Sequence, residues 1–213
     1  MSRIGVLGTG DVGQALAKGL KKHGYQVRIG SRTREKMAAF AAENGIEAGT
    51  FGEVAEWADT LVLAVKGAVA AEVLEGCGRK NLAGKPILDT TNPIADEPPE
   101  DGVLRFFTGP NSSLMETLQT SFPEARFVKC FSLVGSEFMI DPQFPDGKPT
   151  MFYCGNDPGA KIEVAHLIEQ VGWEAADMGT AKAARAIEPL AQLWCIPGIR
   201  ENKWSHAFRL LRM

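Results

Sequence analysis

A glycine-rich loop near the amino end, Gly8-Thr9-Gly10-Asp11-Val12-Gly13, has the spacing of loops that bind the pyrophosphate of a dinucleotide. It follows a short apolar run, Arg3–Leu7, and leads into Val12–His23, where apolar residues recur at helical spacing. In such a unit the glycines permit a tight turn, close approach of the pyrophosphate and close packing of helix on strand. The helix start adds N–H groups and a positive dipole end. A tight turn without a ligand is the competing interpretation.

The segment after the second apolar run, Gln26–Ile29, indicates which dinucleotide this loop would bind. An NAD-binding unit carries Asp or Glu there for the ribose 2′-hydroxyl, whereas a nearby arginine accommodates the 2′-phosphate of NADP. This chain has Ser31 and Arg32 in that place and no acid. Residues 28–36 carry a net charge of +3 in a chain whose formal charge is −3. The segment therefore predicts NADP, and a solvated helix start with Thr33 as its N-cap is the alternative.

Residues after the later apolar runs are the next candidates, because ligands of parallel α/β sheets lie beyond the carboxyl ends of the strands. Val65 could pack on a nucleotide ring, and Asn92 could bind a ribose or a carboxamide. Pro93 would fix the turn, and Lys66 would either approach a phosphate or stay in solvent.

We assign no catalytic side chain from the sequence. The three histidines, His23, His166 and His206, lie in predicted helices away from the strand ends. The four cysteines are scattered without metal-ligand spacing, so we expect buried thiols and no metal site. Direct hydride transfer between two ring systems needs no acid or base from the protein, since the cofactors carry the chemistry.

The elements that must position these residues alternate between short apolar runs and longer helical patterns, which predicts a doubly wound, mostly parallel Rossmann-type α/β sheet. The predicted strands are Arg3–Leu7, Gln26–Ile29, Thr60–Val65, Pro86–Leu88, Arg126–Phe131 and Thr150–Cys154. The predicted helices are Val12–His23, Arg34–Asn44, Pro158–Val171, Thr180–Trp194 and Asn202–Leu211. The last two form a short C-terminal helical extension, separated at Ile196-Pro197-Gly198, and long loops span Asn92–Gly109 and Asp141–Pro149.

Composition sets the remaining expectations. A length of 213 residues with 45% hydrophobic side chains suits one NADP-binding domain over 1–213, with a dinucleotide-binding core at 1–135 and further βα units and helices at 136–213. The mild negative charge gives no attraction to nucleic acid or to an anionic membrane. No run approaches the ~20 apolar residues of a membrane span. We therefore expect a soluble, cytoplasmic protein, whose apolar C-terminal helices pack on its own core or in a dimer interface.

Four motifs together resemble the coenzyme F420-dependent NADP oxidoreductases over nearly the whole chain. They are the Gly8–Gly13 loop, Ile29-Gly30-Ser31-Arg32, Asp89-Thr90-Thr91-Asn92-Pro93 and Leu190-Ala191-Gln192-Leu193-Trp194. The resemblance implies a homodimer that exchanges hydride between NADP(H) and the 5-deazaflavin coenzyme F420.

The resemblance also implies roles for single residues. The loop Thr9–Val12, the pair Ser31-Arg32 and Lys36 would hold the adenosine end of NADP, while Val65 and Pro93 would border the nicotinamide. The deazaflavin would lie near Phe131, Ser132 and Leu133 and the C-terminal helices.

Two other functions stay open. The chain could reduce another acceptor with NADPH, such as a flavin, a quinone, a ferric chelate or a small carbonyl compound, or it could be a non-catalytic NADP-binding sensor. The β-hydroxyacid dehydrogenases and pyrroline carboxylate reductases share the amino-terminal pattern but add a large helical domain. Only about eighty residues follow Phe131, and they begin with another predicted strand, which disfavours those families.

Overall fold

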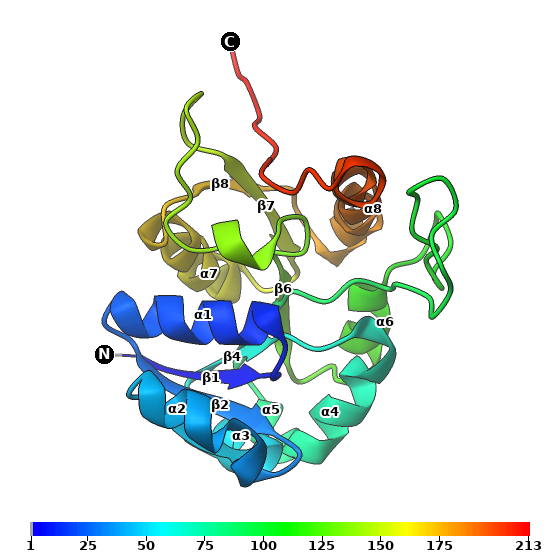
Figure 1. Ribbon diagram of the computed structural model, residues 1–213. Helices are drawn as coiled ribbons and strands as arrows, with labels where there is room; N and C mark the ends of the chain where they lie inside the picture. Colours follow the sequence, from blue (N-terminus) through cyan, green and yellow to red (C-terminus); the bar gives the residue numbers. More distant parts are fainter. Residues whose placement is uncertain (1) are drawn as a thin grey trace.

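The computed structural model describes residues 2–213, and their strands form one eight-stranded sheet in the order β3-β2-β1-β4-β5-β6-β7-β8 (Figure 1). All neighbouring strands are parallel except β6 and β7, which are antiparallel. The strand order reverses between β1 and β4. The prediction of a doubly wound, mostly parallel sheet is therefore confirmed. The strands are β1 (Arg3–Leu7), β2 (Gln26–Ser31), β3 (Glu47–Thr50), β4 (Thr60–Leu63), β5 (Pro86–Asp89), β6 (Arg126–Lys129), β7 (Thr150–Gly155) and β8 (Glu174–Asp177).

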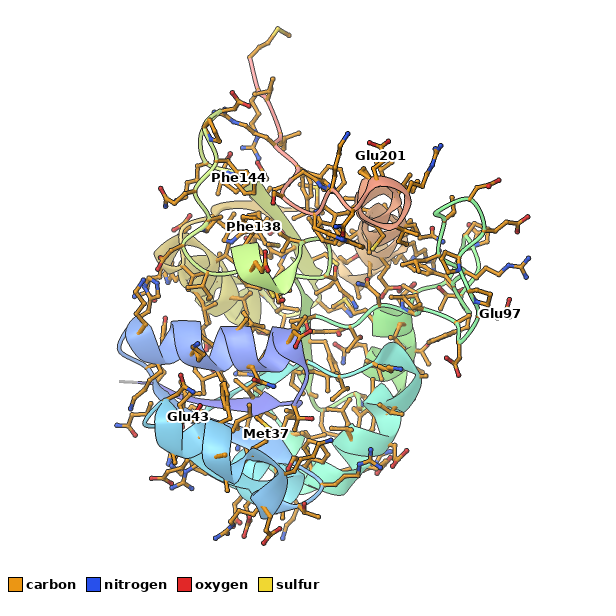
Figure 2. The ribbon with its side chains drawn as sticks, in the orientation of Figure 1. Met37, Glu43, Glu97, Phe138, Phe144 and Glu201 are labelled. Carbon is orange, nitrogen blue, oxygen red and sulfur yellow. The ribbon has the colours of Figure 1, made fainter. Side chains whose placement is uncertain are left out.

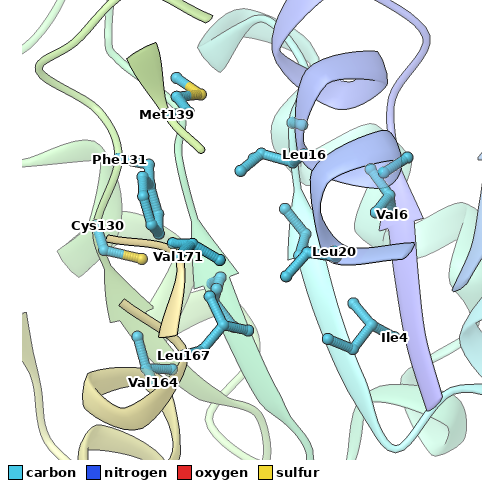
Figure 3. Packing of buried hydrophobic residues seen from close by; sticks show 14 of the residues in the cluster. Ile4, Val6, Leu16, Leu20, Cys130, Phe131, Met139, Val164, Leu167 and Val171 are labelled. Carbon is cyan, nitrogen blue, oxygen red and sulfur yellow. The ribbon is translucent and has the colours of Figure 1, made fainter. Parts of the chain in front are cut away.

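Helices cover both faces of the sheet and bury one apolar cluster on each. One face carries α1 (Asp11–Lys22), α2 (Ala38–Glu43) and α7 (Pro158–Gln170). Figure 3 shows part of this cluster, with Leu16 and Leu20 of α1 beside Val6 of β1. The other face carries α3 (Phe51–Trp57), α4 (Ala70–Cys77), α5 (Arg79–Leu82), α6 (Leu114–Ser121) and α8 (Ala184–Glu201). Short 3-10 turns are η1 (Arg34–Met37), η2 (Gly67–Val69), η3 (Ser136–Phe138) and η4 (Ala181–Ala183).

Two strands lack the apolar run by which the others were predicted. β3 reads Glu-Ala-Gly-Thr and β8 reads Glu-Ala-Ala-Asp, and both lie at an edge of the sheet. An edge strand pairs on one side only and is less enclosed, so it needs fewer large apolar residues. Two predicted strands also end earlier than expected, β4 at Leu63 and β6 at Lys129. Phe131 has a φ of +56°, which no strand residue adopts.

The prediction for the carboxyl-terminal segment is wrong in two respects. α8 runs without a break from Ala184 to Glu201 and includes Pro197, although a break was expected there. Residues 202–213 form no helix. Asn202 adopts the left-handed conformation and ends α8, and the Lys203 N–H donates to the Pro197 carbonyl. Farther along, the Thr150 N–H donates to the Phe208 carbonyl, so the tail bonds to the start of β7 in place of its own helix.

The tail folds back along α8. Trp204 lies against Gly198, where a Cβ would stand 2.2 Å from the indole, and the His206 ring stacks on Trp194 with centroids 5.0 Å apart. Trp194 is thereby buried within the chain, whereas Leu193 is 55% exposed. Intrachain packing therefore accounts for part of the apolar C-terminal surface, and the dimer interface stays a prediction.

The two long predicted loops are ordered by different contacts. Residues 92–109 include an antiparallel bridge between Ile94 and Phe106, and Gln192 Nε2 of α8 donates to the Leu104 carbonyl at 2.7 Å. Figure 1 shows this green loop beside the orange-red α8. In the second loop Phe144 packs on Phe138 with ring centroids 5.2 Å apart, and both are labelled in Figure 2. Within residues 2–213, no helix has the length and apolar character needed to cross a membrane.

Candidate functional site

The glycine loop connects β1 to α1 and has two conformationally different glycines. Gly8 has a φ of +144°, and a Cβ there would stand 2.0 Å from the Ala64 carbonyl oxygen, so the position requires glycine. At Gly10 a Cβ would meet no atom of the described residues within 4 Å. Gly10 therefore keeps open the space in front of α1.

The amino end of α1 is free to meet a ligand. Gly10 is its N-cap, and no side chain of the described residues caps it. Asp11 and Val12 form the first turn, and Gln14 Nε2 donates to the Thr9 carbonyl at 2.9 Å, which fixes the loop from behind. A Cβ on Gly13 would stand 2.5 Å from the Gly8 carbonyl oxygen, so helix and loop approach closely there. This arrangement suits an anion at the helix start.

The end of β2 places Ser31 and Arg32 at the same edge of the sheet, with β2 parallel to β1. Ser31 is buried and its hydroxyl donates to the Thr33 carbonyl, and this hydrogen bond stabilises the turn after β2. Thr33 makes no side-chain cap to the helical turn that follows. Thr33 therefore stands at the N-cap position of an exposed helical turn, as the alternative expects, but its side chain does not cap that turn.

The positive charge of residues 28–36 is partly neutralised within the chain. Arg28 pairs with Glu47 at 2.5 Å, and Arg34 pairs with Glu53 at 2.5 Å. Arg32 and Lys36 are exposed and form no ion pair within residues 2–213. Fewer cations are thus available to a 2′-phosphate than the net charge of residues 28–36 suggested. Of these, Arg32 lies directly after the end of β2.

Three further strand ends converge beside this loop. After β4, Val65 is half-buried and Lys66 is exposed. A Cβ on Gly67 would stand 2.1 Å from the Asn92 carbonyl oxygen, so the segments after β4 and β5 touch. After β5, Asn92 Nδ2 donates to the Ser132 carbonyl at 2.6 Å, which joins β5 to β6.

Two polar atoms at this junction are buried without a partner among the described residues. They are Asn92 Oδ1 and Ser132 Oγ. Buried polar atoms are rarely left unpaired in a native protein, so their position points to a polar group supplied from outside the chain. Phe131 and Leu133 instead belong to the two apolar clusters, 1% and 0% exposed, and Pro93 is buried. The side chains of Phe131 and Leu133 therefore shape the site from within the core.

A buried charge cluster, formed by Lys129, Asp89 and Glu188, lies directly behind these loops. The Lys129 ammonium lies 2.7 Å from Asp89 Oδ2 and 3.1 Å from Glu188 Oε1, and it donates to the Thr91 carbonyl at 2.7 Å. All three side chains are at most 2% exposed. The cluster therefore joins β5, β6 and α8 in the interior.

The partners of the cluster leave few of its polar atoms unsatisfied. Asp89 Oδ1 accepts from the Thr91 N–H at 2.9 Å and from the Thr91 hydroxyl at 2.6 Å. Glu188 accepts from the backbone N–H groups of Leu114 and Met115 at the start of α6. Although burial alone would lower the pKa of Lys129, the carboxylates of Asp89 and Glu188 raise it above its usual value, so the lysine is charged.

Sequence reasoning missed this cluster, although a signal was present. Lys129 interrupts the apolar run Phe127-Val128-Lys129-Cys130-Phe131, and Asp89 ends the run before it. The two occupy paired positions on adjacent strands. Opposite charges at the ends of two buried strands are rarely tolerated unless they pair, which would have predicted the contact.

A cavity of about 430 Å³ lies between α8 and the loop that precedes α6. Its lining includes Phe106, Thr108, Ser112, Glu188 and Gln192. Glu188 thus links the cavity to the buried charge cluster. The cavity offers room for a small molecule, and among its lining residues Glu188 reaches Lys129 at the end of β6.

Residues 3–93 match the family model described as NADP oxidoreductase, coenzyme F420-dependent. A provisionally assigned F420-dependent NADP-reductase of Arthrobacter sp. FB24 is 31% identical, each chain is covered completely, and the two structures superpose with a TM-score of 0.92.

Two curated proteins match parts of longer chains. Metalloreductase STEAP3 of Rattus norvegicus is 29% identical over 201 residues, which is 92% of this chain and 38% of the relative. Ketol-acid reductoisomerase (NADP(+)) of Mycobacterium ulcerans is 36% identical over 80 residues, 38% of this chain and 24% of the relative. The chain therefore spans well under half of these curated relatives.

Proposed function

Because the chain belongs to the coenzyme F420-dependent NADP oxidoreductase family, we propose that it transfers hydride between NADP(H) and a deazaflavin of the F420 type. The observation that carries the NADP part is the open space at Gly10 before an uncapped helix start, with Arg32 at the next strand end. Family membership supports the deazaflavin part.

The adenosine end of the site consists of residues 8–13 and 31–36. The backbone N–H groups of the first turn of α1 would hold the pyrophosphate, and the Gly10 gap leaves room for it. Arg32 would pair with the 2′-phosphate, because its guanidinium forms no ion pair with an acid of the described residues. Lys36 lies on the same segment and would add a second positive charge.

The nicotinamide end consists of residues 65–67, 89–93 and 131–133. Val65 and Pro93 would border the ring, and the unpartnered Asn92 Oδ1 could accept a hydrogen bond from its carboxamide. NADPH supplies the hydride, and the protein contributes alignment and exclusion of water. No side chain is given an acid or base role.

The partner ring would enter from the cavity between α8 and the loop before α6. This cavity adjoins Glu188, and Asn92 touches Ser132 at the same strand ends. We propose that residues 1–135 hold the dinucleotide and that 136–213 complete the acceptor side, in a cytoplasmic homodimer.

A panel of acceptors tests the proposal. NADPH and NADH are first titrated into the purified protein, and NADPH oxidation is then followed by its absorbance with F420, FMN, ferric citrate and small aldehydes. Turnover with F420 and a clear preference for NADPH are expected. Turnover with another acceptor alone would refute the deazaflavin assignment, and binding of NADPH without any turnover would favour a sensor.

Ferric chelates are the second candidate acceptor, since the likeness to a metalloreductase extends over 92% of this chain. The ferric citrate assay decides between the two. Reduction of ferric citrate at a rate that F420 does not approach would select this alternative.

A further inference from the structure

The loop between β5 and Pro93 has an unusual anchor. Its backbone is held from below by Lys129, whose ammonium donates to the Thr91 carbonyl at 2.7 Å. It is held again by Asp89, whose Oδ1 accepts both the N–H and the hydroxyl of Thr91. Asn92 is the next residue, so the direction of its side chain depends on how Thr91 is fixed.

The same cluster also reaches α8 and α6. Glu188 contacts the Lys129 ammonium at 3.1 Å and accepts the N–H groups of Leu114 and Met115. One buried lysine thus connects the loop that carries Asn92 and Pro93 with the helix that lines the acceptor cavity. The Lys129 side chain is fully buried, so its ammonium group contacts protein atoms and no solvent.

Resting on the proposed function, we propose that Lys129 is a positioning residue for the nicotinamide ring, acting through Thr91 and Asp89 on Asn92 and Pro93. Lys129 does not touch the cofactor in this arrangement. It fixes the backbone that presents the Asn92 amide, and through Glu188 it sets the distance between that backbone and α8.

The proposal separates the two ends of the site. Lys129 forms no hydrogen bond or ion pair with residues 8–13 or 31–36, so we expect its loss to leave the adenosine end intact. The part of the NADPH affinity that the nicotinamide contributes is the part that Lys129 controls. Comparison of NADPH with 2′-phospho-ADP-ribose, which lacks the ring, isolates that contribution.

The experiment measures both dissociation constants by calorimetry for the full chain and for Lys129→Met. The wild type is expected to bind NADPH more tightly than 2′-phospho-ADP-ribose. In Lys129→Met the dissociation constant for 2′-phospho-ADP-ribose divided by that for NADPH should fall about tenfold, as expected for lost hydrogen bonds to a charged group. The affinity for 2′-phospho-ADP-ribose should stay unchanged, and the fluorescence of the bound reduced nicotinamide should shift toward that of free NADPH.

A second variant covers the case in which Lys129→Met does not fold. Thr91→Val removes only the hydroxyl bond to Asp89 and leaves the buried charges paired, and it should lower the ratio about threefold. Lys161→Met is the matched control. It removes a lysine that pairs with Asp177 at 2.9 Å at the carboxyl end of β8, and because β8 runs antiparallel to β6, this pair lies toward the amino end of β6.

The outcomes divide cleanly. A fall in the ratio for Lys129→Met or Thr91→Val, but not for Lys161→Met, supports the positioning role. An equal loss for both ligands, an unchanged ratio in both variants, or a wild-type ratio of one overturns it while NADP binding stands. Failure of the wild type to bind either ligand overturns the proposed function itself, and the positioning role with it.

Discussion

The two ends of the candidate site differ in where their polar groups lie. At the adenosine end Gly10, Arg32 and Lys36 are exposed, and α1 begins without a side-chain cap. Behind the nicotinamide end the ammonium of Lys129 is buried and pairs with the buried carboxylates of Asp89 and Glu188. The cations of the first end have no ion-pair partner among the described residues, whereas the charged groups behind the second end are paired within the protein.

This difference reflects the cost of leaving a charge unpaired. An exposed guanidinium is solvated by water until a phosphate displaces that water, so it needs no protein partner. A buried ammonium has no such alternative and must find its acceptors within the fold. The exposed cations of the adenosine end can therefore be altered with little effect on folding, whereas the charges behind the nicotinamide end are part of the folded core.

The largest effect is expected for Glu188→Ala. This change leaves Lys129 with one carboxylate and removes the acceptor of two N–H groups of α6, so it should lower the free energy of unfolding by about 3–5 kcal/mol. Urea denaturation measures it. Glu116→Ala is the control, because Glu116 also joins α6 to α8, through Arg185 at 2.7 Å, but is partly exposed. Glu116→Ala should lower the free energy of unfolding by about 1 kcal/mol. Equal losses in the two variants would contradict the difference between the buried and the exposed ion pairs.

Arg32→Asp should weaken NADPH binding by about 1.5–3 kcal/mol, roughly ten- to a hundredfold, and favour NADH. The carboxylate repels the 2′-phosphate and can accept the ribose hydroxyl instead. Fluorescence titration with both dinucleotides measures the preference. Arg34→Gln serves for comparison, since Arg34 is already paired with Glu53, and should have the smaller effect. Unchanged NADPH affinity in Arg32→Asp would remove Arg32 from the site.

Gly10→Ala should weaken NADPH binding by about 1 kcal/mol or more, because its methyl group occupies the space in front of α1. Its melting temperature should match the wild type, since that space is empty of protein atoms among the described residues. Gly8→Ala should do the reverse and destabilise the fold itself, as its Cβ would stand 2.0 Å from the Ala64 carbonyl oxygen. Thermal melts with and without NADPH separate the two, and identical behaviour of both variants would contradict the assignment.

The smallest effect concerns the thiols next to the buried charges. Burial raises the pKa of Cys154 to about 12 and raises that of Cys130 well above its usual value. The pKa of the half-buried Cys195 is also raised by burial. The thiolate is the reactive form, so alkylation should be slow at pH 8 and faster as the pH rises. Mass spectrometry should find Cys195 modified first; early modification of Cys130 would show that the nicotinamide end opens readily.

The sheet was largely predictable because its central strands are enclosed on both faces. Runs such as Arg3–Leu7 and Thr60–Leu63 must be apolar for that reason, and each was visible in the sequence. The edge strands β3 and β8 face fewer neighbours and gave no such pattern. Residues 202–213 look amphipathic, yet their bonds to Thr150 at the start of β7 override a local helical preference.

The glycine turn between β1 and α1 was predicted from the sequence, and the buried cluster of Lys129, Asp89 and Glu188 was not. The Gly8–Gly13 loop and Arg32 lie within one βαβ unit, where local spacing is informative. The ion pairs of Arg28 with Glu47 and of Lys129 with Glu188 join residues that are distant in sequence. Charge counts along the chain cannot show which cations are already paired.

The contact between Glu188 and the start of α6 bears on the order in which parts of the chain can fold. Residues 3–50 include the glycine loop, Arg32 and the three strands β1, β2 and β3, which are close together in sequence. The bond from Leu114 to Glu188 joins residues 74 positions apart, and the Lys129 pair waits for the same glutamate. Until α8 has emerged and docked, Lys129 and Asp89 lack their third partner. The pairing of β1 with β2 thus depends on residues close in sequence, whereas the anchor of the loop that carries Asn92 is complete only when α8 has docked.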